Sequence, residues 1–146
     1  MSELWRGKAP LVLASKSAAR RALLAAAGLP FEVSAADIDE RAAEMPLRAE
    51  GAAPEAIAAH LARAKALAVS GEKPKRLVIG ADQVLALKGE IFSKPQTLAA
   101  AKAQLQNFSG KTHALHSALC VARDANVLFE TVATALDEAE HAALEA

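Results

Sequence analysis

A short segment near the start of the chain places hydroxyl and guanidinium groups where a helix is expected to begin. Ser15 and Ser17 follow the apolar run Leu11–Ala14, and Arg20 and Arg21 fall in the first turns of that helix. Helix N-termini have unpaired N–H groups and a partial positive charge, so each cation there costs about 0.3–1 kcal/mol. A bound anion such as phosphate, held by the hydroxyls, N–H groups and a guanidinium, would remove that conflict. An arginine that pairs with a glutamate or extends into water is an equally good interpretation of this segment alone.

Carboxylates form a second group of candidates. The segment Gly80-Ala81-Asp82-Gln83 ends an apolar strand with an acidic residue, and open α/β sheets bind ligands at the carboxyl ends of their strands. Asp37, Asp39 and Glu40 form a further acidic turn after another short strand. A turn-forming role for Asp82 and a solvated acidic turn are the simpler interpretations. However, Glu40 or Asp39, together with Asp82, would supply the oxygen ligands that hard divalent cations prefer.

Two lysines complete the set. Lys65 borders the apolar face of a predicted helix, and Lys94 follows a short strand in Ser93-Lys94-Pro95. Considered singly, each would be a surface lysine. Together with the arginines they supply enough positive charge for a polyphosphate, although the chain as a whole has 17 basic and 17 acidic residues. That balance argues against binding of nucleic acid or an anionic membrane through bulk charge.

The composition of the chain excludes several further classes. Its 146 residues suffice for one domain, residues 1–146. Cys120 is the single cysteine, which excludes an internal disulfide framework and favours a reducing cytoplasm. No apolar run approaches the roughly 20 residues that a membrane helix needs. Phosphate-loop, dinucleotide-binding and zinc-protease motifs are also absent from the sequence.

Apolar periodicity predicts the elements that must position these residues. Helices are expected at 20–27, 54–69 and 97–107, and strands at 11–14, 31–34, 77–80, 91–92, 112–123 and 127–135. Residues 84–87 are either a separate strand or a continuation of the strand before Asp82. This order predicts an α/β fold with a mixed, partly parallel sheet flanked by helices.

Three local expectations concern the parts outside the central elements. Residues 41–53 are expected to form a loop. The helix that Thr97 caps is expected to turn four side chains toward the core: Leu98, Ala101, Leu105 and Phe108. Asp137 with Glu140 resembles a capping box, so residues 136–146 are expected to begin a terminal helix after a core that spans residues 10 to about 135.

Six pieces of sequence, in a fixed order, point to a known family. They are Leu13-Ala14-Ser15-Lys16-Ser17 with Arg20-Arg21; Asp39-Glu40; Leu61-Ala62-Arg63-Ala64-Lys65-Ala66; Gly80-Ala81-Asp82-Gln83-Val84; Gly89-Glu90-Ile91 with Lys94-Pro95; and Ser109-Gly110-Lys111-Thr112-His113. None is specific alone. Their order, from residue 11 to about 121, resembles that of Maf-type nucleotide pyrophosphatases.

The resemblance implies the mixed α/β fold shared with inosine triphosphatase-like enzymes. It also implies hydrolysis of a nucleoside triphosphate to a monophosphate and pyrophosphate with a divalent cation, Mg²⁺ or Mn²⁺. Asp82 matches the general base, and Glu40 matches a carboxylate that positions the metal or water, so both are expected to hold the cation. The substrate-binding residues implied are Ser15, Ser17, Arg20, Lys65, Gln83 and Lys94. A homodimer and a link to septum formation are further implications.

Two departures from the common family pattern bear on the substrate. Many members have Ser-Pro-Arg-Arg where this chain has Ser17-Ala18-Ala19-Arg20, and Gln83 stands where the dTTP/UTP-directed branch has threonine. Both features resemble the branch associated with 7-methyl-GTP. The amide of Gln83 would bind substrate or orient Asp82, and a structural role is an equal alternative.

The end of the chain is the largest departure. Family members continue beyond the helix expected near Asp137 into a strand and a glycine-rich segment that helps close the nucleotide site, whereas this sequence ends at Ala146. We therefore expect a cleft open on one side and reduced or absent activity. The alternatives are a non-catalytic module that binds nucleotide or regulates division, and a structural remnant without a ligand.

Overall fold

The computed structural model describes residues 6–92 and 96–138, and it confirms a mixed α/β fold built on one six-stranded sheet. The strand order is β2-β1-β3-β5-β6, with β4 paired to β3. The β1–β2 and β1–β3 pairs are parallel, and the remaining pairs are antiparallel. The strands are β1 (Leu11–Leu13), β2 (Phe31–Val33), β3 (Val78–Leu87), β4 (Glu90–Phe92), β5 (Thr112–Arg123) and β6 (Asn126–Glu138).

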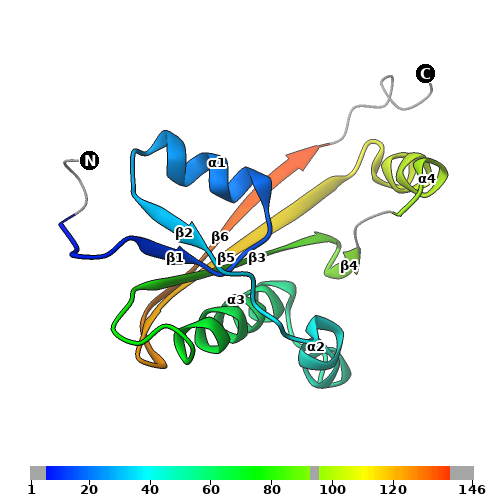
Figure 1. Ribbon diagram of the computed structural model, residues 1–146. Coiled ribbons are helices and arrows are strands. Elements are labelled where there is room, and N and C mark those ends of the chain that lie inside the picture. Colours follow the sequence, from blue (N-terminus) through cyan, green and yellow to red (C-terminus); the bar gives the residue numbers. More distant parts are fainter. Residues whose placement is uncertain (1–5, 93–95, 139–146) are drawn as a thin grey trace.

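Helices lie on both faces of this sheet (Figure 1). Helix α1 lies over one face, whereas α3 covers the other, with α2 beside it; α4 lies near the start of β5, at the opposite end of the β5–β6 hairpin from its turn. Their bounds are α1 (Ala18–Ala26), α2 (Glu40–Ala49), α3 (Pro54–Ser70) and α4 (Leu98–Phe108). No helix among the described residues is long and apolar enough to cross a bilayer.

The core lies between α3 and strands β3 and β5. Ile57, Leu61 and Ala62 of α3 pack with residues of alternate positions on β5, including Ala118 and Cys120. A side chain at Gly80 of β3 would collide with the backbone of α3, because its Cβ would meet the Ala62 carbonyl oxygen and lie 2.6 Å from the Ala66 nitrogen. The missing side chain therefore lets α3 approach β3 closely.

The structure resolves one alternative and corrects two predictions. Strand β3 runs without a break from Val78 to Leu87, so residues 84–87 continue the strand that carries Asp82. The prediction that the strand ends at Asp82 is therefore wrong. The prediction of a loop at 41–53 is wrong, because residues Glu40–Ala49 form α2. Asp39 caps this helix, its Oδ1 accepting from the Ala42 N–H at 3.1 Å. Pro46 lies inside the helix, where proline removes a backbone donor, and this hides the helical pattern in the sequence.

Two predictions at the far end of the sheet are also wrong. Helix α4 does begin after Thr97, but Leu98 is 88% exposed, Leu105 is exposed too, and only Phe108 of α4 is buried. The terminal helix does not begin at 136, because β6 continues its ladder with β5 as far as the pair Thr112–Glu138. The rest of that predicted helix, including Glu140, lies outside the described residues.

Candidate active site

Asp82 lies on a stretch of β3 that has an open edge. The pairing of β1 with β3 ends where the Ala14 N–H donates to the Ile79 carbonyl at 2.9 Å. The pairing of β4 with β3 ends at Leu85. Between these points, no described strand pairs with β3 on that side. The strand that carries Asp82 therefore borders a gap, and the loops after β1 and β2 enter it.

A lysine from α3 joins two carboxylates in this gap. Lys65 Nζ lies 3.0 Å from Asp82 Oδ1 and 2.5 Å from Glu40 Oε1. The side chains of Lys65 and Asp82 are only 15% and 13% exposed, whereas that of Glu40, at the N-terminus of α2, is 53% exposed. The acidic turn and the β3 carboxylate thus meet through one ammonium group, which we call the carboxylate–lysine cluster (Glu40, Lys65, Asp82).

Burial and charge act in opposite directions on the two buried members of this cluster. Burial raises the pKa of Asp82, and the nearby charge of Lys65 only partly offsets that effect. For Lys65, burial disfavours the charged form, but its hydrogen bonds and charge interactions with Glu40 and Asp82 outweigh burial and raise its pKa. The ammonium therefore remains charged at neutral pH, while Asp82 holds a proton more readily than an ordinary aspartate does.

The second half of the site is the hydroxyl–guanidinium group formed by Ser15, Ser17 and Arg20. Ser17 caps α1, its Oγ accepting from the Arg20 N–H at 3.3 Å. Ser15 Oγ accepts from the Ser17 N–H at 3.1 Å and from Arg20 Nη1 at 3.0 Å. The guanidinium is therefore folded back over the start of its own helix, next to the N–H groups where an anion would bind.

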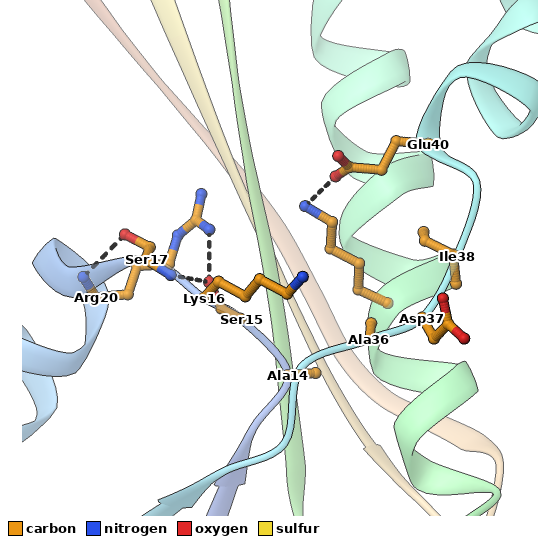
Figure 2. Close-up of a pocket in the computed structure, with 10 residues that line it drawn as sticks. Ala14, Ser15, Lys16, Ser17, Arg20, Ala36, Asp37, Ile38 and Glu40 are labelled. Atoms are coloured by element: carbon orange, nitrogen blue, oxygen red, sulfur yellow. Dashed lines mark hydrogen bonds and ion pairs between the residues drawn. The ribbon is translucent and has the colours of Figure 1, made fainter.

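Both halves line one cavity of about 310 Å³. Figure 2 shows Ser15, Ser17 and Arg20 on one side of it and Glu40 on the other. Lys65 also lines this cavity. Asp82 lies at its border, because it shares one adjoining cavity with Arg20 and another with Glu40. The predicted residues therefore converge, although they come from segments far apart in the sequence.

Six of the eight predicted site residues are brought together in this way: Ser15, Ser17, Arg20, Glu40, Lys65 and Asp82. Gln83 is adjacent but lies on the α1 side of the sheet, where its Nε2 donates to Ser117 Oγ at 3.2 Å. Its position follows from alternation along β3, which directs neighbouring side chains to opposite faces. Lys94 lies outside the described residues, so its role stays a prediction.

Some residues at the site were not predicted to belong to it. Lys16 lines the same cavity as Ser15 and Glu40, together with Asp37 of the predicted acidic turn. Arg48 and Glu44 of α2 line the cavity that Asp82 shares with Glu40, and they form an ion pair at 3.1 Å. Recognising Asp39 as a helix cap would have placed Glu44 and Arg48, four residues apart, on one side of a helix near Glu40. Ser117 carries no such local signal, because only strand pairing brings it beside Gln83.

The arrangement can bind a polyphosphate and position water beside it. Cationic groups and N–H donors surround one cavity, and a carboxylate of raised pKa borders it. Such cationic groups can stabilise phosphate charge. Among the described residues no group of three or more histidine, cysteine or acidic side chains is arranged to hold a metal. Glu40 and Asp82 nevertheless fit a Mg²⁺-type ion, since both reach the same ammonium, and such ions often take one or two carboxylates and complete their coordination with phosphates and water.

Comparison with known proteins identifies the family. A family model described as "Maf-like protein" matches residues 10–145. The chain therefore belongs to the Maf-like protein family.

Curated relatives are similar over most of this chain. One, named 7-methyl-GTP pyrophosphatase, from Brucella suis, is 55% identical over 125 residues, which cover 86% of this chain and 63% of that protein. Another, named nucleoside triphosphate pyrophosphatase, from Bradyrhizobium diazoefficiens, is 50% identical over 132 residues, covering 90% and 64%. The chain thus spans somewhat under two thirds of the length of these relatives.

Proposed function

We propose that this chain hydrolyses a nucleoside triphosphate to the monophosphate and pyrophosphate. The observation that carries this proposal is the meeting of the carboxylate–lysine cluster and the hydroxyl–guanidinium group at one cavity. The names of the relatives, which are pyrophosphatases, support the same reaction class. In this reaction water attacks the α-phosphorus, the bond to the bridging oxygen breaks, and pyrophosphate leaves.

Each half of the site has a role in this reaction. Asp82 accepts the proton of the attacking water from its position at the border of the cavity. Arg20, Lys65 and the N–H groups at the start of α1 bind the phosphates and stabilise their charge. Glu40 and Asp82 would hold the divalent cation, Mg²⁺ or Mn²⁺, which when bound supplies further charge neutralisation. Lys94 is proposed as an additional phosphate contact.

For the substrate we propose a modified purine nucleotide, 7-methyl-GTP. The cavity on the α1 side of β3 has mainly apolar walls, including Leu23 and Leu119, and it also borders Arg20 and Asp82. A planar base fits apolar walls of this kind. The Gln83 amide at its edge could then exchange its bond to Ser117 for one to the base. The relatives named for 7-methyl-GTP support this choice.

The test is pyrophosphate release from a panel of standard and methylated nucleotides with Mg²⁺ or Mn²⁺. We expect 7-methyl-GTP to be hydrolysed fastest. Asp82→Asn should reduce kcat at least about a hundredfold, the lower end of the range for positioned base catalysis, while nucleotide binding persists. Glu72→Gln, which removes an exposed carboxylate just beyond the C-terminus of α3, is the control. Full activity of Asp82→Asn would remove Asp82 from this role.

A second candidate is nucleotide binding without turnover, including a division-regulating module. This candidate uses the same cavity and the same phosphate-binding groups but no attacking water. Calorimetric binding of nucleotide with no pyrophosphate released in the same sample would select this candidate. A cytoplasmic location, a homodimer, independence of nucleic acid and membranes, and a link to septum formation all stay predictions.

A further inference from the structure

We propose that Lys65 occupies the cation position of the nucleotide-free site, so that the divalent cation binds only together with nucleotide phosphates that draw the Lys65 ammonium away. This inference rests on the proposed function, since it concerns the same carboxylates. It assigns to Lys65 an exchange between two partners, carboxylate and phosphate, rather than a fixed phosphate contact.

The geometry of the carboxylate–lysine cluster makes the two cations competitors. Lys65 Nζ lies within hydrogen-bond distance of Glu40 Oε1 and Asp82 Oδ1. A Mg²⁺ ion held by the same two oxygens would lie about 2.0–2.1 Å from each, which is closer to both than the ammonium nitrogen is. Two positive charges cannot share that space, so binding of the metal requires the ammonium to leave.

The carboxylates alone offer a poor site while Lys65 is in place. No third histidine, cysteine or acidic side chain joins them in a metal-binding arrangement within residues 6–92 and 96–138. Mg²⁺ loses its water reluctantly and is usually bound through one or two carboxylates plus substrate phosphates. The nucleotide would therefore provide the missing ligands at the same moment as it provides a new partner for the lysine.

The Lys65 side chain also has space to move into. Its side chain lines the cavity that the hydroxyl–guanidinium group lines from the opposite side, and its stem is flexible. Helix α3 does not need to move, which matters because its contact with Gly80 leaves no space for a shift toward β3. A rotation of one side chain transfers the ammonium from the carboxylates to a phosphate.

The experiment is a titration of the nucleotide-free protein with Mn²⁺ alone, with free Mn²⁺ measured by electron paramagnetic resonance. We expect Lys65→Met to bind Mn²⁺ at least tenfold more tightly than the unsubstituted chain. Addition of a non-hydrolysable α,β-methylene nucleotide should tighten Mn²⁺ binding by the unsubstituted chain. Lys65→Gln serves as a second variant should the methionine variant not fold.

Two control variants isolate the effect. Arg63→Met removes a cation from the same helix, but Arg63 pairs with Glu130 at 2.8 Å, so it should leave Mn²⁺ binding unchanged. In the double variant Lys65→Met/Glu40→Gln the gain should disappear, because one of the two carboxylates is lost. Thermal unfolding of each variant verifies that it is folded.

Equal Mn²⁺ affinity with and without Lys65, or tight binding by the unsubstituted chain before nucleotide is added, would overturn the exchange. The outcome is separable from that of the proposed function. If pyrophosphate is released but Lys65→Met does not bind Mn²⁺ more tightly, the proposed hydrolysis stands and the exchange is rejected. If Lys65→Met binds Mn²⁺ more tightly but no nucleotide is hydrolysed, the exchange is supported and the proposed hydrolysis is rejected.

Discussion

Helices α1 and α3 each bring a cation to the same cavity, but they are held in place differently. Helix α3 buries eight of its 17 residues, whereas no residue of α1 is buried. A cavity lined by Leu23, Leu24 and Leu119 lies between α1 and the sheet. The position of Lys65 is therefore set by packing against β3 and β5. That of Arg20 is set locally, by hydrogen bonds to Ser15 and Ser17.

This difference suggests a division of labour within the site. In the proposed reaction the carboxylate–lysine cluster would need precise placement, because a base acts only within hydrogen-bond reach of its water. It lies on the tightly packed side, where Gly80 fixes the separation between strand and helix. The proposed phosphate binding would tolerate more adjustment, and it would use the loosely packed helix α1.

The largest expected effect comes from truncating leucines on the two helices. Leu61 on α3 is 4% exposed and Leu23 on α1 is 69% exposed. Leu61→Ala should lower the free energy of unfolding by about 2–5 kcal/mol, the usual loss for a buried leucine. Leu23→Ala should change it by less than about 0.5 kcal/mol, as surface substitutions do. Urea unfolding of both variants measures the contrast, and equal losses would contradict the difference between the helices.

An intermediate effect is expected from the cap of α1. Ser17→Ala removes the oxygen that accepts from the Arg20 N–H and should cost about 1 kcal/mol of stability. Because that loss is at the binding site, it should also weaken nucleotide binding, measured by calorimetry. The matched control is Thr97→Ala, which removes the equivalent cap of α4, where Thr97 Oγ1 accepts from Ala100 N at 3.0 Å. Similar nucleotide affinities for the two variants would show that the α1 terminus does not bind phosphate.

Part of the site could be predicted from the sequence, because some of its residues lie next to short apolar strands or on a clearly periodic helix. Ser15 follows β1, as predicted, and β1 pairs in parallel with β3. Asp82 does not end its strand, because β3 continues to Leu87. The periodicity of α3 was also clear, since Ile57 and Leu61 share its buried face. These features follow from patterns among neighbouring residues and do not require knowledge of tertiary contacts.

The rest depended on contacts between distant segments. Residues 41–53 contain Pro46, which lies inside the helix in the structure, so the clearest local sign of a helix there is its cap at Asp39. Leu98 and Leu105 have helical spacing, but the sheet offers them no buried surface. That Lys65 contacts both carboxylates depends on how closely α3 approaches β3, which the absent side chain of Gly80 decides. No local pattern contains that information.

The smallest expected effect is a pH dependence that separates Asp82 from an ordinary paired carboxylate. Because burial raises the pKa of Asp82, the folded protein binds this proton more tightly than the unfolded chain does. The resulting stabilisation is present below the ordinary pKa of 3.8 and is lost as the pH rises through the raised value. Asp82→Asn should therefore be at least as stable as the unsubstituted chain at neutral pH. As the pH falls through the pKa of Asp82, the free energy of unfolding of the unsubstituted chain should rise relative to that of the variant. Urea unfolding of both proteins at several pH values measures this. If the variant is instead less stable at neutral pH, and this difference in stability shrinks on acidification, the pKa of Asp82 is lowered. The charge of Lys65 would then outweigh burial at Asp82.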